Sequence, residues 1–222
     1  MPFTVFIIVY ILNAINLIDG IDGLASGLSI IAFFAFSCMF IRLQWWMYAF
    51  ICLAAFGVLL PFFYYNVFGK IRRGRKIFMG DTGSTFLGYM LATVSIMGLF
   101  KFYAVISFAV PFLILGLPIF DTANAIIRRV AAGRSPMSPD RGHVHHKLID
   151  MGFNQKQAVA ILYAISATLG LTAVVLTSSG EVKAIVLLLA VLAAILVGAC
   201  IIYGAEHWSK HAPENKEDKD DE

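Results

Sequence analysis

Charged residues are scarce in this sequence. They account for 14% of its 222 residues, whereas soluble domains carry about 25%. Hydrophobic residues account for 59%, and mean hydropathy is +0.81. These proportions exclude a soluble globular domain, a disordered chain and a secreted disulfide scaffold. They predict an all-α fold, a polytopic bundle of transmembrane helices.

Cysteine is also scarce, and no cleavable signal peptide is evident. The N-terminal residues lack the basic region and the small-residue cleavage site that such a peptide needs. The cysteines lie in separate apolar stretches without metal-binding spacing, so we expect small buried side chains. They are Cys38, Cys52 and Cys200.

Acidic residues are rare outside residues 206–222. That segment carries seven acids and three lysines, which predicts a disordered cytoplasmic tail after a transmembrane domain of residues 1–205. The 205 residues before the tail hold seven acids and 14 basic residues. These acids are Asp19, Asp22, Asp81, Asp121, Asp140, Asp150 and Glu181.

The apolar runs predict about seven membrane spans, because a helix needs roughly 20 apolar residues to cross a bilayer. Pro111 and Pro118 fall inside the fifth, which we expect to be kinked or broken. Asn154 and Gln157 predict a capping box at the start of the sixth. The predicted spans are residues 3–18, 24–41, 45–65, 84–100, 103–127, 157–177 and 183–203.

The connections between these spans differ in charge. Residues 66–83 and 128–156 are rich in lysine and arginine, and the positive-inside rule places both in the cytoplasm. Alternation then puts residues 20–23 and the tail on the same side, and Met1 on the outer side. The chemically rich segments therefore share one face, which predicts a site at the cytoplasmic membrane surface.

Polar residues recur every three positions at the end of the first predicted span. On a helix this spacing makes one polar stripe, which normally faces a cavity, a partner or an ion. A glycine follows each aspartate and lets another group approach closely. The alternative is that the aspartates end the helix in a turn. The four residues are Asn13, Asn16, Asp19 and Asp22.

Asp81 lies in the segment Met79–Ser84, which follows a basic loop and opens a predicted helix. One interpretation is an ordinary N-cap. The other is a ligand of Mg²⁺, which proteins hold with one or two carboxylates together with substrate phosphates. The helix N-terminus and the flanking glycines favour an approaching phosphate.

Three of the five histidines fall within residues 143–146, beside Arg141. A juxtamembrane basic stretch often only anchors to anionic lipid, but such anchoring does not require clustered imidazoles. Histidines beside arginines suit a phosphorylated substrate. A zinc site is the less favoured alternative. The three histidines are His143, His145 and His146.

Asp121 is expected about two turns inside the cytoplasmic end of the fifth span. Its sequence context leaves two interpretations open, a site residue or a structural carboxylate paired with a neighbouring base. Taken together, isolated carboxylates and clustered cations predict phosphoryl transfer between a water-soluble and a lipid-borne substrate. A structural membrane subunit and a secondary transporter are the alternative classes; one-sided clustering without an internal repeat argues against the transporter.

The sequence resembles the polyprenyl-phosphate N-acetylhexosamine-1-phosphate transferases, a family that includes the phospho-MurNAc-pentapeptide translocases. The matching strings are NAINLIDGIDGLASG, IFMGDTGSTFLGY, PIFDTANAIIRR and SPDRGHVHHKL, within residues 13–148. The HVHHKL form resembles the branch that starts O-antigen, enterobacterial common antigen or teichoic-acid polymers.

The resemblance implies transfer of N-acetylhexosamine-1-phosphate, with GlcNAc-1-phosphate as the favoured group, from a UDP-sugar to undecaprenyl phosphate, with release of UMP. It implies Mg²⁺ held by Asp81, with Mn²⁺ as an alternative, and a multi-pass protein of the bacterial inner (plasma) membrane. Membrane lipid is an expected partner and nucleic acid is not. The implied catalytic residues are Asp19, Asp22, Asp81, His143, His145 and His146. The implied substrate-binding residues are Asn13, Asn16, Asn66 on the uridine side, Arg141 and Asp121.

Two features depart from the family pattern. The family carries an aspartate pair on an early cytoplasmic loop, whereas the adjacent aspartates of this chain are Asp220 and Asp221 in the tail. Several N-terminal spans of the family are also expected to be absent, and the loop between Asn66 and Asp81 is longer than usual. The alternative function is therefore a truncated, inactive fragment or a structural subunit. A homodimer or a complementing N-terminal portion is an expected partner.

Overall fold

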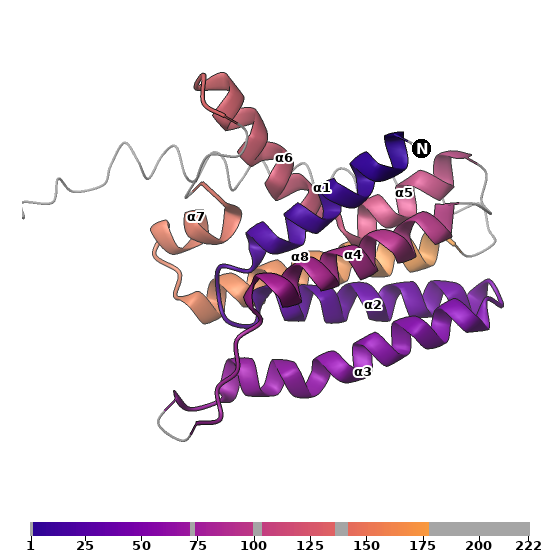
Figure 1. Cartoon of the computed structure of the whole chain (residues 1–222), viewed down its shortest axis with the longest axis horizontal. Coiled ribbons are helices and arrows are strands. Elements are labelled where there is room, and N and C mark those ends of the chain that lie inside the picture. The colour runs from indigo at the N-terminus through magenta and orange to yellow at the C-terminus, as the bar shows by residue number, and fades with distance from the viewer. Residues whose placement is uncertain (1, 72–73, 100–103, 136–141, 178–222) are drawn as a thin grey trace, which may run out of the picture.

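The protein is a bundle of helices (Figure 1). The computed structural model describes residues 2–71, 74–99, 104–135 and 142–177, and no strand occurs within these ranges. This architecture confirms the all-α prediction. The α-helices are α1 (Pro2–Ile18), α2 (Leu24–Arg42), α3 (Trp46–Phe68), α4 (Gly80–Leu99), α5 (Ala104–Ile114), α6 (Gly116–Ala131), α7 (Val144–Asp150) and α8 (Gln155–Leu176).

The helices follow the predicted membrane spans. Helices α2, α3 and α8 are each long and apolar enough to cross a membrane, and α1 is a shorter apolar helix. The bounds of α1 and α2 agree with the predicted spans to within one residue at each end. The predicted span at residues 183–203 and the acidic tail at 206–222 lie outside the described residues.

The fifth predicted span is broken into α5 and α6 at Leu115. Pro118 lacks the N–H that would bond the carbonyl oxygen of Ile114, and its ring crowds that carbonyl. The helical ladder resumes around the break, because Leu115 donates to Pro111 at 2.9 Å and accepts from Ile119 at 3.0 Å. The predicted break is confirmed, and it frees α6 to take its own direction.

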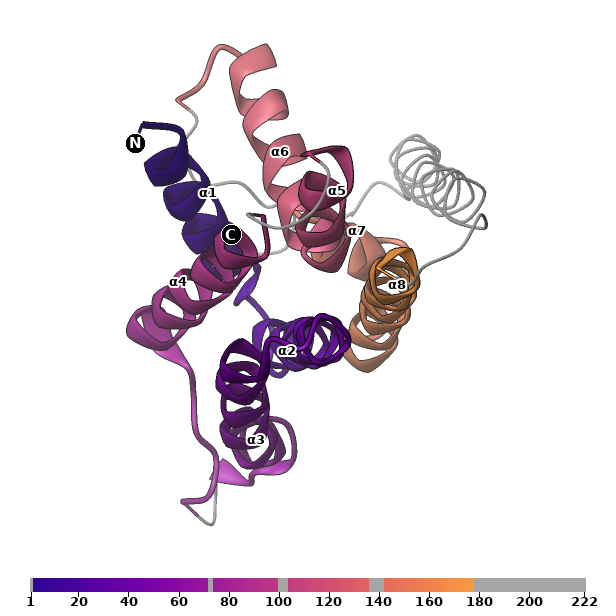
Figure 2. The ribbon, with the colours of Figure 1, turned by 90° about the vertical axis from the view of Figure 1, so that its right-hand side faces the viewer.

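Helix α2 lies at the centre of the bundle and packs against α3 and α8 (Figure 2). Helices α1 and α4 form a second closely packed pair. Gly88 permits this approach, since a β-carbon at that position would lie 2.7 Å from Cα of Leu12. Close contact of backbones across a glycine is a common way to join membrane helices without a hydrophobic driving force.

The helix ends and loops that carry the predicted motifs gather at one end of the bundle, on the left of Figure 1, near α7. The N-terminus lies at the opposite end. At the motif end, α8 begins with the predicted capping box. The side chain of Asn154 accepts from the backbone N–H of Gln157 at 2.9 Å, and the side chain of Gln157 accepts from Asn154 N–H at 3.0 Å. The structure thus collects the motifs on one face, as the topology predicts.

One of the two described cysteines is buried as expected, and the other is only partly buried. Cys52 is buried in the apolar core, and Cys38 is half-buried on α2. Both are free thiols. Cys200 lies outside the described residues.

Candidate active site

The turn Asp19–Gly23 joins α1 to α2 and is the centre of the candidate site. Helix α1 ends at Ile18, so Asp19 and Asp22 do not continue its polar stripe. The prediction of one helical stripe is therefore wrong for the aspartates, because the two Asp-Gly pairs end the helix. Gly23 adopts a left-handed conformation with φ of +84°, which a residue with a side chain reaches only with strain.

Asn16 connects the end of α1 to the start of α4. Its side-chain Nδ2 donates to Oγ of Ser84 at 2.8 Å. This bond brings the first motif against the segment that contains Asp81. Asn13, one turn earlier, donates to the carbonyl oxygen of Val9 at 2.7 Å within its own helix.

Asp81 lies in the first turn of α4, at the helix end where the backbone dipole favours a negative charge. Its side chain is exposed. Gly80 begins the helix with φ of +65°, so Asp81 is inside the helix and is not its N-cap. An exposed carboxylate in this position remains open to a ligand.

The pKa of Asp19 is affected by the other two carboxylates at this end of the bundle. Its pKa is raised from 3.8 to about 6, first by burial, then by the negative charge of Asp81 and that of Asp22. Three carboxylates from two segments are therefore close enough to repel one another. A concentration of negative charge of this kind suits a divalent cation.

Asp22 forms an ion pair with Lys76 of the basic loop between α3 and α4. The side chain of Asp22 is 41% exposed and that of Lys76 is 17% exposed. The ammonium group of Lys76 also lies 5.4 Å from the ring centre of Phe78. The loop therefore packs onto the turn and brings a cation beside the aspartates.

Asn66, near the end of α3, is buried with 5% of its surface exposed. Its Oδ1 accepts from the backbone N–H of Gly23 at 2.7 Å. Its Nδ2 donates to the carbonyl oxygen of Ile77 at 2.8 Å. Both ends of the amide thus hold protein backbone, one in the turn and one just before α4.

Asp121 on α6 holds the histidine segment in place. The residue is 3% exposed, and its Oδ2 lies 2.9 Å from Nδ1 of His143. Its Oδ1 accepts from the backbone N–H of Val144 at 2.9 Å, at the start of α7. The structure therefore favours the interpretation of Asp121 as a carboxylate paired with a neighbouring base, and that base is a predicted site residue.

His145 lies against the turn and has no hydrogen-bond partner among the residues that the structure describes. It is 2% exposed, and neither ring nitrogen is bonded. A β-carbon at Gly20 would lie 3.1 Å from its Nε2, so the glycine admits the ring. The pKa of His145 is lowered from 6.5 to about 4, first by burial and next by His146. With this lowered pKa it is an uncharged imidazole at neutral pH, in which one ring nitrogen is a donor and the other an acceptor.

The other two predicted histidines lie beside this imidazole. The ring centre of His146 lies 4.2 Å from that of His145, and the His143 ring is parallel to the His145 ring at 5.9 Å. On α6, the guanidinium of Arg128 packs against Gly142, directly before the histidines. Arg141 lies outside the described residues.

The residues at this end fit a magnesium ion that shares its coordination with a substrate. Within the described residues, no three His, Cys, Asp or Glu side chains form a ready-made metal cage. Mg²⁺ does not need such a cage, because it keeps several waters and uses one or two carboxylates with phosphate oxygens. The exposed Asp81, with Asp19 close enough to be affected by its charge, fits that arrangement.

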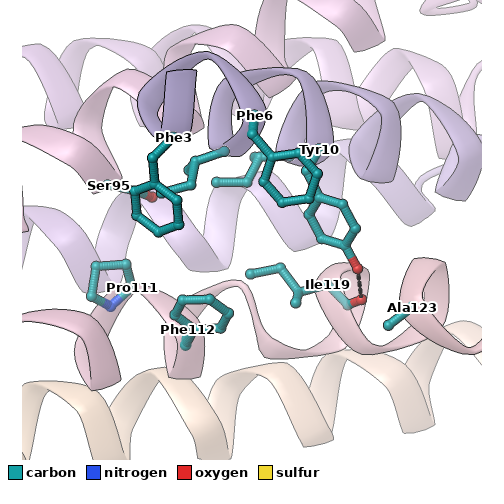
Figure 3. A pocket seen from close by; sticks show the side chains of 10 residues that line it. Phe3, Phe6, Tyr10, Ser95, Pro111, Phe112, Ile119 and Ala123 are labelled. Atoms are coloured by element: carbon teal, nitrogen blue, oxygen red, sulfur yellow. Dashed lines mark hydrogen bonds between the residues drawn. The ribbon is translucent and has the colours of Figure 1, made fainter. Parts of the chain in front are cut away.

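An apolar cavity of about 310 Å³ lies between α1, α5 and α6. Figure 3 shows Phe3, Phe6 and Tyr10 of α1 facing Pro111 and Phe112 of α5. Ile119 and Ala123 of α6 and Ser95 of α4 also line it, and the Tyr10 hydroxyl donates to the carbonyl oxygen of Ile119 at 2.7 Å. These two α6 residues flank Asp121, so the cavity and the histidine segment share a helix.

Sequence reasoning did not identify Tyr163, which lies in the middle of α8 and donates a hydrogen bond to the carbonyl oxygen of Gly23. It also did not identify Gly27, whose missing β-carbon leaves room for the Tyr163 ring. A tyrosine in an apolar span carries no sequence signal for such a contact. The glycines after the two aspartates did predict close approach, and His145 beside Gly20 shows it.

Comparison with known proteins places these residues in a family context. The model of glycosyl transferase family 4 matches residues 1–99. This segment holds α1 to α4 and the first two motifs.

Curated relatives match over more of the chain. A probable undecaprenyl-phosphate N-acetylglucosaminyl 1-phosphate transferase of Bacillus subtilis (strain 168) is 42% identical over 80% of this chain and 48% of its own length. An undecaprenyl-phosphate alpha-N-acetylglucosaminyl 1-phosphate transferase of Yersinia pestis is 33% identical over 89% of this chain and 54% of its own. The Escherichia coli (strain K12) protein of that name is 34% identical over 68% and 41%. The chain spans about half the length of these relatives.

Proposed function

Because the chain belongs to glycosyl transferase family 4, we propose that it transfers N-acetylhexosamine-1-phosphate from a UDP-sugar to undecaprenyl phosphate. The names of the relatives support undecaprenyl phosphate as the acceptor and N-acetylglucosamine as the sugar. In this reaction a phosphate oxygen of the lipid attacks the β-phosphorus of the UDP-sugar. The new diphosphate bond forms, and the bond from that phosphorus to UMP breaks.

The observation that supports this proposal best is the meeting of the motifs around the turn Asp19–Gly23. Asn16, just before the turn, bonds to Ser84 of the second motif. Gly20, in the turn, lies against His145 of the third motif. Asp121 of the fourth motif holds His143. Negative carboxylates thus face an imidazole and basic side chains across one small region, as phosphoryl transfer requires.

We assign separate roles to the residues of this region. Asp81 would hold Mg²⁺, or Mn²⁺, which when bound neutralises charge on the transferring phosphoryl group. Asp19, with its raised pKa, can accept a proton from the lipid phosphate if that phosphate arrives protonated. His145 donates a hydrogen bond to a phosphate oxygen and so satisfies its unpaired, buried ring.

The apolar cavity suits the isoprenoid part of the acceptor. Its walls are aromatic and aliphatic side chains of α1, α5 and α6. The donor, a water-soluble UDP-sugar, would reach the exposed Asp81 from the aqueous end of the bundle.

The site end of the bundle is proposed to face the cytoplasm from the plasma membrane of a bacterium. The basic residues of the loop after α3 and the last turn of α6, which holds Arg128 and Arg129, support this orientation. A cytoplasmic site also has access to nucleotide sugars. The product would serve as the first lipid-linked intermediate of an envelope polysaccharide such as lipopolysaccharide O-antigen, enterobacterial common antigen or teichoic acid.

A second candidate is that the chain acts only with a complementing polypeptide, or serves as a structural subunit without activity. The supporting observation is that the adjacent aspartates of the sequence are Asp220 and Asp221 in the acidic tail. No aspartate pair occurs before that tail. In this case a second chain would supply the missing carboxylates to the shared site.

The test is transfer of radiolabelled sugar-1-phosphate from UDP-N-acetylglucosamine to undecaprenyl phosphate in membranes containing the chain. The membranes are assayed alone and with the N-terminal half of a curated relative co-expressed, and Asp81→Asn is the matched control. Lipid-linked product that depends on Asp81 supports the enzyme. Product only in the co-expressed sample shows that the chain is active only together with a complementing N-terminal half. No product in either sample contradicts the proposed activity.

A further inference from the structure

The backbone of Gly23 forms hydrogen bonds with side chains of two helices that lie far from it in the sequence. Its backbone N–H donates to Oδ1 of Asn66 on α3 at 2.7 Å. Its carbonyl oxygen accepts the hydroxyl hydrogen of Tyr163 on α8. The two polar groups of Gly23 therefore bond to side chains of two other helices, α3 and α8. The carbonyl oxygen also accepts from the backbone N–H of Gly27 at 2.7 Å and from Oγ of Ser26 at 3.2 Å.

The contact of Tyr163 depends on a notch in α2. Gly27 faces the phenol ring, and a β-carbon at this position would overlap the tyrosine hydroxyl. The ring also packs against Phe63 of α3 at 6.3 Å between centres. Apolar packing accounts for the ring of Tyr163, but it gives no reason for the hydroxyl group. Within the described part of the chain, the hydroxyl donates to the carbonyl oxygen of Gly23.

The turn needs external support because of its composition. Two of the five residues of the turn are glycines, Gly20 and Gly23. Glycine loses more backbone freedom on folding than any other residue. Asp22 and Asp19 sit on this soft segment, where their charges repel each other and that of Asp81. Without fixed anchors the carboxylates would move apart.

We propose that Tyr163 is a positioning residue for the transfer reaction, acting with Asn66 to clamp Gly23. The clamp sets the position of Asp19 relative to Asp81, and it keeps Gly20 against His145. Tyr163 touches no reacting atom and acts through the turn. This inference rests on the proposed function for its effect on catalysis, while the clamp itself is a property of the folded chain.

The direct test is amide hydrogen exchange on the purified full chain carrying Tyr163→Phe, which removes only the hydroxyl. Exchange at the Gly23 amide is expected to rise by about fivefold, the size of one neutral hydrogen bond. Exchange in the second half of α2 stays unchanged. The matched control is Tyr89→Phe on α4, where the tyrosine is exposed, and this variant leaves the Gly23 amide as in the parent chain.

Kinetics supply the second readout, in the membranes that give lipid-linked product. Tyr163→Phe is expected to lower kcat by about fivefold with the KM for undecaprenyl phosphate unchanged. Loss of folded protein would instead change the amount extracted and the exchange of every helix. Unchanged Gly23 exchange, or faster exchange throughout the chain, overturns the clamp. If the parent chain yields no product, the proposed function fails, and the exchange result still decides the clamp.

Discussion

Nδ1 of His143, the residue directly before α7, lies 2.9 Å from Oδ2 of Asp121 on α6, although the two residues are 22 positions apart. The other carboxylate oxygen of Asp121 receives the N–H of Val144. One buried side chain therefore fixes both the ring of the first histidine and the start of the helix that carries the next two. The orientation of the whole histidine segment depends on this pair.

The first prediction concerns this pair. Asp121→Asn keeps the size of the side chain but loses its charge and one of its acceptor oxygens. We expect transfer to fall by about tenfold or more, because a hydrogen bond to a charged buried group contributes about 1.5–3 kcal/mol. A double-mutant cycle with His143→Gln measures the coupling. Fully additive losses would show that the two residues act independently.

The second prediction concerns the contact between Gly20 and His145. Gly20→Ala places a β-carbon 3.1 Å from Nε2 of His145, so the imidazole must move. We expect a loss of transfer activity with little loss of folded protein. The control is Gly57→Ala on α3, where an added β-carbon meets nothing within 4 Å. Equal transfer activity of the two variants would show that the contact between Gly20 and His145 does not matter for transfer.

The third prediction concerns Asp81 and its neighbour. Asp81→Asn is expected to abolish transfer by removing the charge that we propose holds Mg²⁺. The same change lowers the pKa of Asp19 below about 6, since repulsion from Asp81 raises it. Burial, the larger cause, remains, so the pKa stays above 3.8. Carboxyl ¹³C NMR of labelled Asp19 in metal-free buffer measures the pKa of Asp19 in both proteins. An unchanged pKa would show that Asp81 lies too far from Asp19 to affect its charge.

The fourth prediction concerns stability against pH. The pKa of His145 is lowered to about 4 in the folded chain from 6.5, so the unfolded chain binds more protons between these values. Its contribution to stability is therefore present above pH 6.5 and is lost as the pH falls toward 4. The thermal midpoint of the parent chain should fall more than that of His145→Gln as pH drops from about 7 to about 4. Parallel curves would contradict a buried neutral imidazole.

Much of the fold could be predicted from the sequence because hydrophobic runs set helix length in a membrane. The bounds of α1 and α2, the break at Leu115 and the capping box at Asn154 all follow from local signals. Pro118 predicted the break, since its missing N–H acts on the residue four positions earlier. Local chemistry of this kind needs no knowledge of tertiary contacts.

The sequence predicted which residues belong to the candidate site, but it did not predict the contacts between them. Spacing alone placed Asp19 and Asp22 on a helical stripe, whereas the helix ends at Ile18. The bonds of Asn66 to Gly23 and Ile77 join segments that only the folded bundle brings together. Tyr163 was missed for the same reason, since its partner is 140 residues away.

The central claim is that the buried, unpaired imidazole of His145 faces the substrate phosphates. Its most direct test is the rate of UMP release by His145→Ala in membranes where the parent chain forms lipid-linked product, with insertion and folded yield measured in parallel. The account predicts normal insertion and a rate lowered by about a hundredfold or more, as expected for loss of a group acting on developing charge. A rate near that of the parent chain would contradict it.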